Sequence, residues 1–276
     1  MKAIALGYHD VIDTKDSQHK LLPNTRLRYA LDLDSFRAHL DSVAERTSRI
    51  ARADDRKRWG DLPIFLTFDD GAECALTVIA DELEKRAWRG QFFVTTNWIG
   101  QTGFLSRSQI RELHKRGHGI GSHSCSHPAR MSKLSNNDLR AEWEGSCSIL
   151  EDIVGDSIQT ASVPDGYYSE QVARAAADAG IRTLFTSEPT MSCFGVNGCL
   201  VVGRYFLQRH SPAQLSGELI ARNPWPRWKM AIAWQLKQPI KFVAGAGYLR
   251  LRRFMLARQT KSQNLNSYVG TTLDKS

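Results

Sequence analysis

The sequence predicts an α/β protein in which strands and helices alternate along most of the chain. Residues 64–68 are apolar and rich in strand-forming side chains, and residues 75–86 follow with apolar positions at helical spacing. A short Gly-rich strand is expected at 119–122, because a helix-stopping glycine precedes it at 117. Such alternation is typical of sheets covered by helices. With 276 residues and 42% hydrophobic side chains, the chain can bury a full barrel-sized core.

Two further strands are expected near the ends of this pattern. Residues 3–6 are apolar and run into Gly7, which predicts a first strand at the N-terminus. Residues 201–207 predict a late strand that carries one conspicuous cation, Arg204. No internal repeat or low-complexity tract is visible, and we expect one domain over residues 1–220.

Two adjacent carboxylates lie where the strand at 64–68 ends. Asp69 and Asp70 follow it directly, and Gly71 allows a sharp exit towards the next helix. Enzymes with parallel sheets place their catalytic groups at the carboxyl ends of the strands. These two carboxylates are therefore the first candidates for a functional site.

Two histidines four residues apart follow the strand at 119–122. His123 begins the loop beyond that strand, and Pro128 disfavours regular helix at His127. A strand-end loop can fold both imidazoles onto one ion. His114 and His118 are also four apart, but the glycine at 117 interrupts the helix that would align them, and we expect a solvent-facing helix end there.

One carboxylate and two imidazoles can hold a divalent metal ion. Such a site keeps an open position for water and lowers the pKa of that water from about 15.7 towards ~7. A second carboxylate, close but not coordinated, can take the proton. The pattern therefore predicts a metal-dependent hydrolase.

The same residues resemble a known family. Thr-Phe-Asp-Asp-Gly at 67–71 and His-Ser-x-x-His at 123–127 resemble the first two motifs of the polysaccharide deacetylases, the carbohydrate esterase family 4 or NodB-homology enzymes. The resemblance extends to about Ser211 and implies a distorted (β/α) barrel with fewer than eight regular strands. Three further stretches resemble the exopolysaccharide-associated branch or later steps of the fold: 7–11, 33–40 and 179–183.

The resemblance also assigns roles within the expected site. Asp70, His123 and His127 match the metal ligands, and Asp69 matches the general base. The implied reaction removes N-acetyl groups from N-acetylhexosamine residues of a glycan, an exopolysaccharide or a lipid-linked precursor. The ligand set suits Zn²⁺ best, and Co²⁺, Ni²⁺, Mn²⁺ or Fe²⁺ could occupy it. Cys125 is either an additional soft ligand or, as we prefer, a small residue that fills the loop.

The chain departs from the family pattern at the third motif. The typical Arg-Pro-Pro-aromatic-Gly maps onto Ser-Val-Pro-Asp-Gly at 162–166, so the arginine that pairs with the base is absent. Asp165 stands in place of the aromatic residue, and Tyr167 and Tyr168 are expected to line the sugar site instead. Arg204 is a candidate replacement for the missing arginine. We expect Asp165, Tyr167, Tyr168 and Arg204 to bind substrate.

The last family motif, Leu-x-His, has no clear match, which leaves the general acid open. His9, at the end of the first strand, and His210, after the late strand, are the two catalytic candidates. The alternative for His9 is a packed, hydrogen-bonded histidine. Because these motifs are eroded, the alternative function is a catalytically weak or inactive carbohydrate-binding or scaffold protein. The retained Asp69 favours the enzyme, since a binder has no evident need for that carboxylate.

Basic and aromatic residues dominate the C-terminal extension, residues 221–276. It contains eleven Lys or Arg and one acidic residue, whereas residues 1–220 carry a net charge of −2. It also holds Trp225, Trp228 and Trp234, and residues 248–258 can form a basic amphipathic helix. This combination suits an anionic membrane surface or a membrane glycosyltransferase. A packed structural extension and other acidic partners are the alternatives, and nucleic acid is disfavoured.

The expected compartment is the cytoplasm, peripheral at the inner face of the membrane if the extension binds lipid. The first strand begins too early to leave room for a signal peptide, and no 18-residue apolar span occurs. Five cysteines without a C-x-x-C pair favour reduced thiols, although Cys193 and Cys199 could close a small loop.

Overall fold

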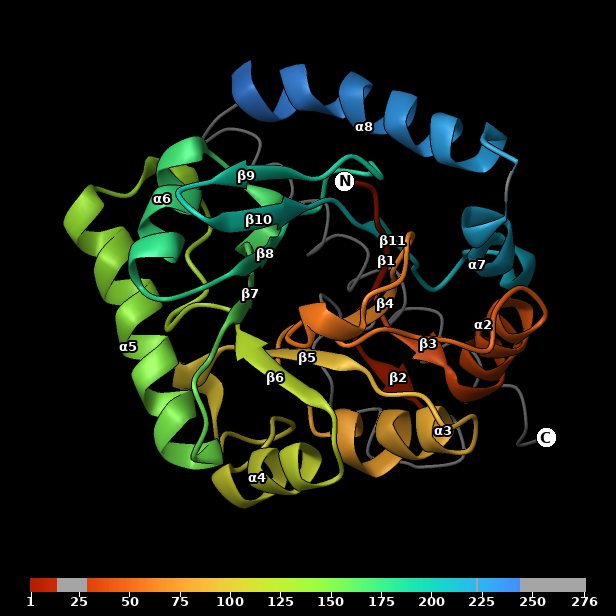
Figure 1. The fold of residues 1–276 in the computed structure, drawn as a ribbon, viewed down its shortest axis with the longest axis horizontal. Coiled ribbons are helices and arrows are strands. Elements are labelled where there is room, and N and C mark those ends of the chain that lie inside the picture. The colour runs from red at the N-terminus through yellow and green to blue at the C-terminus, as the bar shows by residue number, and fades with distance from the viewer. Residues whose placement is uncertain (14–28, 222, 244–276) are drawn as a thin grey trace, which may run out of the picture.

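The computed structural model describes residues 1–13, 29–221 and 223–243, with side chains described up to Leu236. In this part, nine strands form one main sheet, and helices cover its outer face (Figure 1). Hydrogen-bonded neighbours follow the order β11-β1-β4-β5-β6-β7-β8-β10-β9, and every pair is parallel except β10 with β9. The strands are β1 (Ile4–Tyr8), β4 (Ile64–Phe68), β5 (Gln91–Val94), β6 (Gly119–Ser122), β7 (Thr160–Ser162), β8 (Thr183–Phe185), β9 (Phe194–Val196), β10 (Cys199–Val202) and β11 (Tyr205–Phe206).

The sheet curls into an incomplete barrel, which confirms the predicted fold class. β10 pairs with β8, whereas β11, the next strand along the chain, pairs with β1. The two intervening residues, Gly203 and Arg204, therefore span the seam of the barrel. The prediction of one strand over 201–207 is wrong, because the chain breaks at Gly203 to change partners. A Cβ atom at Gly203 would lie 2.4 Å from the carbonyl oxygen of Glu188.

Alternate residues of the strands point into the barrel. Phe65, Phe93 and Phe185 belong to a small apolar cluster in the barrel interior. On β4 the same alternation continues from Phe65 to Thr67 and then to Asp69, just beyond the strand. Asp69 therefore faces the interior above an aromatic floor, whereas the outer face of the strands packs in the main core under the helices.

Helix starts follow signals that are present in the sequence. Asp32, Ser106 and Ser135 accept backbone N–H groups as caps of α2 (Leu33–Ala44), α4 (Arg107–Lys115) and α5 (Asn136–Val154). The helix predicted at 75–86 is partly right: it begins as a π turn and its α-helical part ends at Glu84. The helices are α2 (Leu33–Ala44), α3 (Ala80–Glu84), α4 (Arg107–Lys115), α5 (Asn136–Val154), α6 (Glu170–Asp178), α7 (Ala213–Ile220) and α8 (Trp225–Val243). Shorter elements are β2 (Val11–Ile12), β3 (Leu31–Asp32), η2 (Arg56–Arg58), η3 (Ala75–Ile79), η4 (Thr96–Trp98), η5 (Met131–Lys133) and η6 (Pro164–Gly166).

The C-terminal extension begins with α8, which crosses the top of the view in Figure 1 from α7 past β9 and β10. Among the described residues, no helix combines the length and the apolar character that a membrane span requires. The basic helix predicted at 248–258 lies outside the described residues. All five cysteines are free thiols, and this includes Cys193 and Cys199.

Candidate metal-dependent hydrolase site

The predicted ligands converge at the carboxyl ends of two strands of the same sheet, β4 and β6. Asp70 follows β4, and His123 and His127 lie in the loop after β6. Nε2 of His123 lies 3.4 Å from Oδ1 of Asp70, and Nε2 of His127 lies 3.7 Å from the same oxygen. Tetrahedral ligands at about 2.0–2.2 Å from a zinc ion would be roughly 3.3–3.6 Å apart. The three donors, which all lie within 4.8 Å of one another, therefore fit a divalent metal ion.

Unusual backbone angles shape both ligand loops. Asp70, Ser124 and His127 have positive φ angles of 76°, 65° and 55°. Such conformations cost an L-residue roughly 1–2 kcal/mol each, so other contacts must hold them. The hydroxyl of Ser122 accepts the N–H of Ser124 at 3.1 Å, and the hydroxyl of Ser124 accepts the N–H of His127 at 3.0 Å. These local hydrogen bonds present the two imidazoles to the same carboxylate.

Contacts at Nδ1 of His123, the ring nitrogen that points away from Asp70, fix the tautomer of this histidine. Nδ1 lies 3.0 Å from the carbonyl oxygen of Ser162 and 2.6 Å from its hydroxyl. Because a carbonyl only accepts, Nδ1 carries the proton and the neutral ring presents the lone pair of Nε2 towards Asp70. The Ser162 hydroxyl in turn donates to Oδ1 of Asp69 at 3.1 Å. Ser162 therefore connects a candidate ligand with the candidate base.

The side chain of Arg204 forms a two-point ion pair with Asp69. Its Nη1 donates to Oδ1 at 2.7 Å and its Nη2 to Oδ2 at 2.8 Å. Nε donates to the carbonyl oxygen of Thr186 at 2.9 Å, which fixes the guanidinium plane. Arg204 has no exposed surface and Asp69 only 5%. Arg204 was expected to bind substrate as well, and that expectation is corrected: the buried guanidinium contacts Asp69.

This pair keeps Asp69 ionised despite its burial. Burial raises the pKa of Asp69, but the charges of Arg204 and His123 and the hydrogen bond from Arg204 act against it, so that the pKa is lowered. The missing arginine of the third motif is thus replaced from the barrel seam, and Ser162 occupies the vacated position. Burial also raises the pKa of Asp70, but the hydrogen bond that His123 donates when its ring is protonated lowers it. The positive charges of the nearby histidines in their protonated form act in the same direction, so that the pKa lies below its ordinary value.

His9 and His210, the two candidates for the general acid, lie in different surroundings. The ring of His9 lies 5.0 Å from the ring of Tyr29 and 5.2 Å from that of Phe206, and its charge acts on Asp69. Its Nδ1 atom is buried and has no hydrogen-bond partner among the described residues. His210 lies in an exposed turn, and no interaction in the described ranges joins it to the carboxylates.

The loop that follows β7 brings the remaining candidates near the ligands. Asp165 adopts a positive φ of 53°, and its charge acts on His127. The ring of Tyr167 lies 5.8 Å from the guanidinium of Arg130, and the ring of Tyr168 packs edge-on against Phe194 at 6.0 Å. Asp165 therefore lies near the candidate ligands. Tyr167 and Tyr168 belong to the same loop and contact Arg130 and Phe194.

One aromatic residue beside the ligand loops was not identified from the sequence. Trp98, in the loop after β5, stacks on the ring of His127 with centroids 5.1 Å apart. β5 lies between the two motif strands, so its carboxyl-end loop could have been included on topology alone. The thiol of Cys125 donates to the carbonyl oxygen of Ala141 at 3.8 Å, and Cys125 is not among the three clustered donors.

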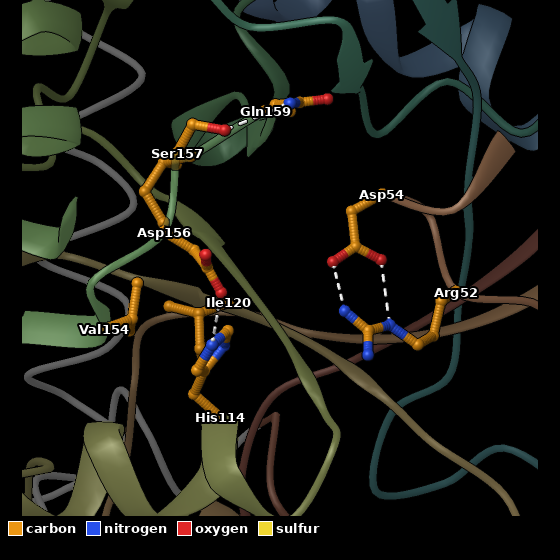
Figure 2. Close-up of a pocket in the computed structure, with 9 residues that line it drawn as sticks. Arg52, Asp54, His114, Ile120, Val154, Asp156, Ser157 and Gln159 are labelled. Carbon is orange, nitrogen blue, oxygen red and sulfur yellow. Dashed lines mark hydrogen bonds and ion pairs between the residues drawn. The ribbon is translucent and has the colours of Figure 1, made fainter.

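A separate polar cavity of about 200 Å³ lies at the amino ends of β6 and β7. Figure 2 shows its charged side chains paired with one another: Arg52 with Asp54, and His114 with Asp156. None of the motif carboxylates or of the candidate ligands lines it. The cavity therefore marks the closed end of the barrel, opposite the candidate site.

Comparisons with known proteins agree with this class of site. The family model for polysaccharide deacetylase matches residues 57–184, which include both ligand motifs. Chitin deacetylase 1 of Cryptococcus neoformans is 27% identical over 163 residues, covering 57% of this chain and 32% of the relative. The chain spans less than half the length of several curated relatives that it matches.

Solved structures show the same fold at low identity. The Streptococcus pyogenes deacetylase PplD superposes with a TM-score of 0.68 at 19% identity, covering 81% of this chain and 99% of that one. IcaB from Ammonifex degensii gives 0.66 at 21% identity, covering 80% and 97%. Fold and site together define a NodB-type deacetylase domain. The chain contains a polysaccharide deacetylase domain over residues 57–184.

Proposed function

We propose that this protein is a metal-dependent hydrolase that removes N-acetyl groups from N-acetylhexosamine residues of a glycan. The observation that carries this proposal is the Asp69–Arg204 pair beside the three converging donors. A protein that only bound sugar would have no use for a buried carboxylate that is held ionised 3.1 Å from a serine on a ligand histidine. The name of the related chitin deacetylase supports the class of substrate.

Asp70, His123 and His127 would hold the metal ion, and Zn²⁺ suits one carboxylate and two imidazoles best. Bound there, the ion would supply polarisation of the acetyl carbonyl and activation of a water molecule. Ser162 keeps the proton of His123 on Nδ1, so that Nε2 remains free to coordinate.

Asp69 is the proposed general base for the attacking water. Arg204 keeps this carboxylate ionised and holds it in one orientation. Because the pKa of Asp69 is lowered, a proton taken from water would be held only weakly and released readily. His9 is the proposed source of a proton for the departing amine, since it lies beside both carboxylates while His210 lies in an exposed turn.

The proposed sugar contacts come from two loops around the ligands. Trp98 presents an aromatic ring next to His127 and can stack on a sugar face. Asp165, Tyr167 and Tyr168, in the loop after β7, would add hydrogen-bonding and apolar surface. An exopolysaccharide chain or a lipid-linked precursor is the proposed substrate.

The test is acetate release from N-acetylglucosamine oligomers by Zn²⁺-loaded protein. Asp69→Asn and His123→Ala should both reduce turnover to background, whereas His114→Ala, at the opposite end of the barrel, should retain it. Absence of turnover from the parent protein with any divalent metal, together with retained glycan binding, would reject the enzyme in favour of the scaffold alternative.

A further inference from the structure

One face of α8 docks firmly on the domain. The guanidinium of Arg227 donates to the carbonyl oxygens of Leu219 and Ala221, each at 2.7 Å, where α7 ends. Met230 packs against the main core. One turn further on, Trp234 reaches the site loop: its ring would lie 3.3 Å from a Cβ atom placed on Gly166. This inner face fixes the orientation of the helix on the domain.

The opposite face of α8 exposes apolar side chains in a row. Trp225, Trp228 and Leu236 are 51%, 54% and 70% exposed. Their spacing of three and then eight residues places them on one side of a helix. Six large hydrophobic side chains are exposed in the described part of the chain, and three of them lie on this helix. Exposed apolar residues grouped in this way indicate a binding surface.

The exposed tryptophans lie among cations. Their rings stack with centroids 5.0 Å apart, and Nζ of Lys229 lies 5.2 Å from the centroid of Trp225. The sequence of α8 has four Lys or Arg and no acidic residue, and the extension that it begins carries a net charge of +10. Tryptophan beside lysine suits the headgroup level of an anionic bilayer, whose negative surface attracts cations.

We propose that α8 docks the protein on an anionic lipid surface through Trp225, Trp228 and Leu236. The helix lies flat in the interface, because its other face is held by α7 and by the loop that carries Asp165. This placement is independent of the proposed reaction. If the domain is the proposed deacetylase, α8 brings its site loop next to the membrane and favours a lipid-linked saccharide as substrate. A cytoplasmic protein, peripheral at the inner face, would match this arrangement.

Flotation of the full chain with vesicles tests the proposal. The probes are vesicles of phosphatidylcholine alone and with about one third phosphatidylserine, at low and high salt. We expect recovery with the anionic vesicles only, falling as salt rises. The double variant Trp225→Glu/Trp228→Glu should lose at least about tenfold in partitioning. Leu62→Glu changes an exposed apolar residue outside the extension, 41% exposed, and should float like the parent.

The possible outcomes separate this proposal from the proposed function. The proposal would be overturned if the double variant floated as well as the parent, or if the parent failed to float. It would also be overturned if the protein, given oligothymidylate as a competing probe, bound this nucleic acid through α8 in preference to the vesicles. Acetate release from soluble oligomers should be unchanged in the double variant, because both tryptophans are exposed and distant in sequence from the ligands. Unchanged turnover together with lost flotation supports lipid docking as a separate property.

Discussion

Two pairs of histidines, each four residues apart, lie nine residues from one another in the chain and are used differently. In the first pair every ring has its own carboxylate: Nε2 of His114 faces Asp156 at 2.9 Å, and Nε2 of His118 faces Glu84 at 3.0 Å. The second ring nitrogen of His118 also accepts the N–H of Gly90. Each ring of the first pair is therefore paired with a different carboxylate, and the two rings do not share one.

The second pair shares a single carboxylate oxygen. His123 and His127 both face Oδ1 of Asp70, at 3.4 and 3.7 Å, and the rings lie 5.0 Å apart. Identical spacing in the sequence therefore has opposite consequences at the two ends of the barrel. The difference lies in what precedes each pair: α4 leads to the first, and β6 delivers the second to the carboxyl edge of the sheet.

The largest expected effect is on Zn²⁺ affinity, which a substitution in the second histidine pair should lower and a substitution in the first should not. His127→Ala removes a proposed metal ligand and should weaken binding by more than about 100-fold, because changes to outer-shell partners alone cost about 10–100-fold. His118→Ala should keep the affinity and lose about 1–3 kcal/mol of unfolding free energy through its two lost hydrogen bonds. Isothermal titration calorimetry and urea unfolding measure the two quantities. Equal loss of zinc binding in both variants would show that spacing alone selects the ligands.

The two ends of the barrel also differ in their ion pairs: Arg204 and Asp69 are fully buried, whereas Arg52 and Asp54 are half-buried. Arg204→Met should cost about 3–5 kcal/mol of stability by leaving the Asp69 charge unpaired, and activity should fall by a factor on the order of 10²–10⁴. The pKa of Asp69 should rise, since burial then acts without Arg204, and the acidic limb of the pH–rate profile should move to higher pH. Arg52→Met, which breaks a half-buried pair at the other end, should leave that profile unchanged.

A second substitution distinguishes charge from packing. Adding Asp69→Asn to Arg204→Met should restore much of the unfolding free energy, because it removes the unpaired charge, while activity stays at background. Stability that remained as low in the double variant as in Arg204→Met would mean that the guanidinium acts chiefly by filling space on the rings of Phe93 and Phe206.

Ser162 should produce a smaller effect at the same end. Ser162→Ala removes the hydroxyl between His123 and Asp69, but the backbone carbonyl still accepts the Nδ1 proton. We therefore expect a loss of about 10-fold in zinc affinity, at the low end for outer-shell changes. Thr160→Val, on the same strand, removes a buried hydroxyl that accepts from Gln91 and should leave zinc affinity unchanged. Equal zinc affinities of the Ser162→Ala variant and the parent would remove Ser162 from the site.

These cases show how far the sequence predicts such a site. The strands at 64–68 and 119–122 were predicted with their observed bounds, because apolar composition and flanking glycines are local signals. The convergence of Asp70, His123 and His127 follows from the order of parallel strands. The break at Gly203 is not a local property, since it depends on β10 and β11 pairing with strands that are far apart in the chain.

The same limit explains how Arg204 and Ser162 were interpreted. When the third motif is considered alone, its missing arginine suggests a loss of catalytic function. In the folded chain the barrel seam brings Arg204 to Asp69, and the short Ser162 side chain leaves room for the guanidinium. A charge that is missing from a motif is therefore supplied by a residue more than forty positions away, which the sequence offered only as a candidate.

The smallest predicted effect is a pH dependence of stability that belongs to the first histidine pair. Burial lowers the pKa of His118 to about 4, with Glu84 acting in the opposite direction, whereas an unfolded histidine titrates near about 6.5. Between these values the unfolded chain binds more protons, so stability should fall as the pH drops from about 6.5 to about 4, by at most ~1.4 kcal/mol per pH unit from this group. His118→Gln should flatten that slope in urea unfolding at pH 7, 6 and 5, while His114→Gln, an exposed pair, serves as the control. An unchanged slope in His118→Gln would mean that the pair at the closed end is not buried in its neutral form, and the contrast between the two pairs would then rest on the metal ligands alone.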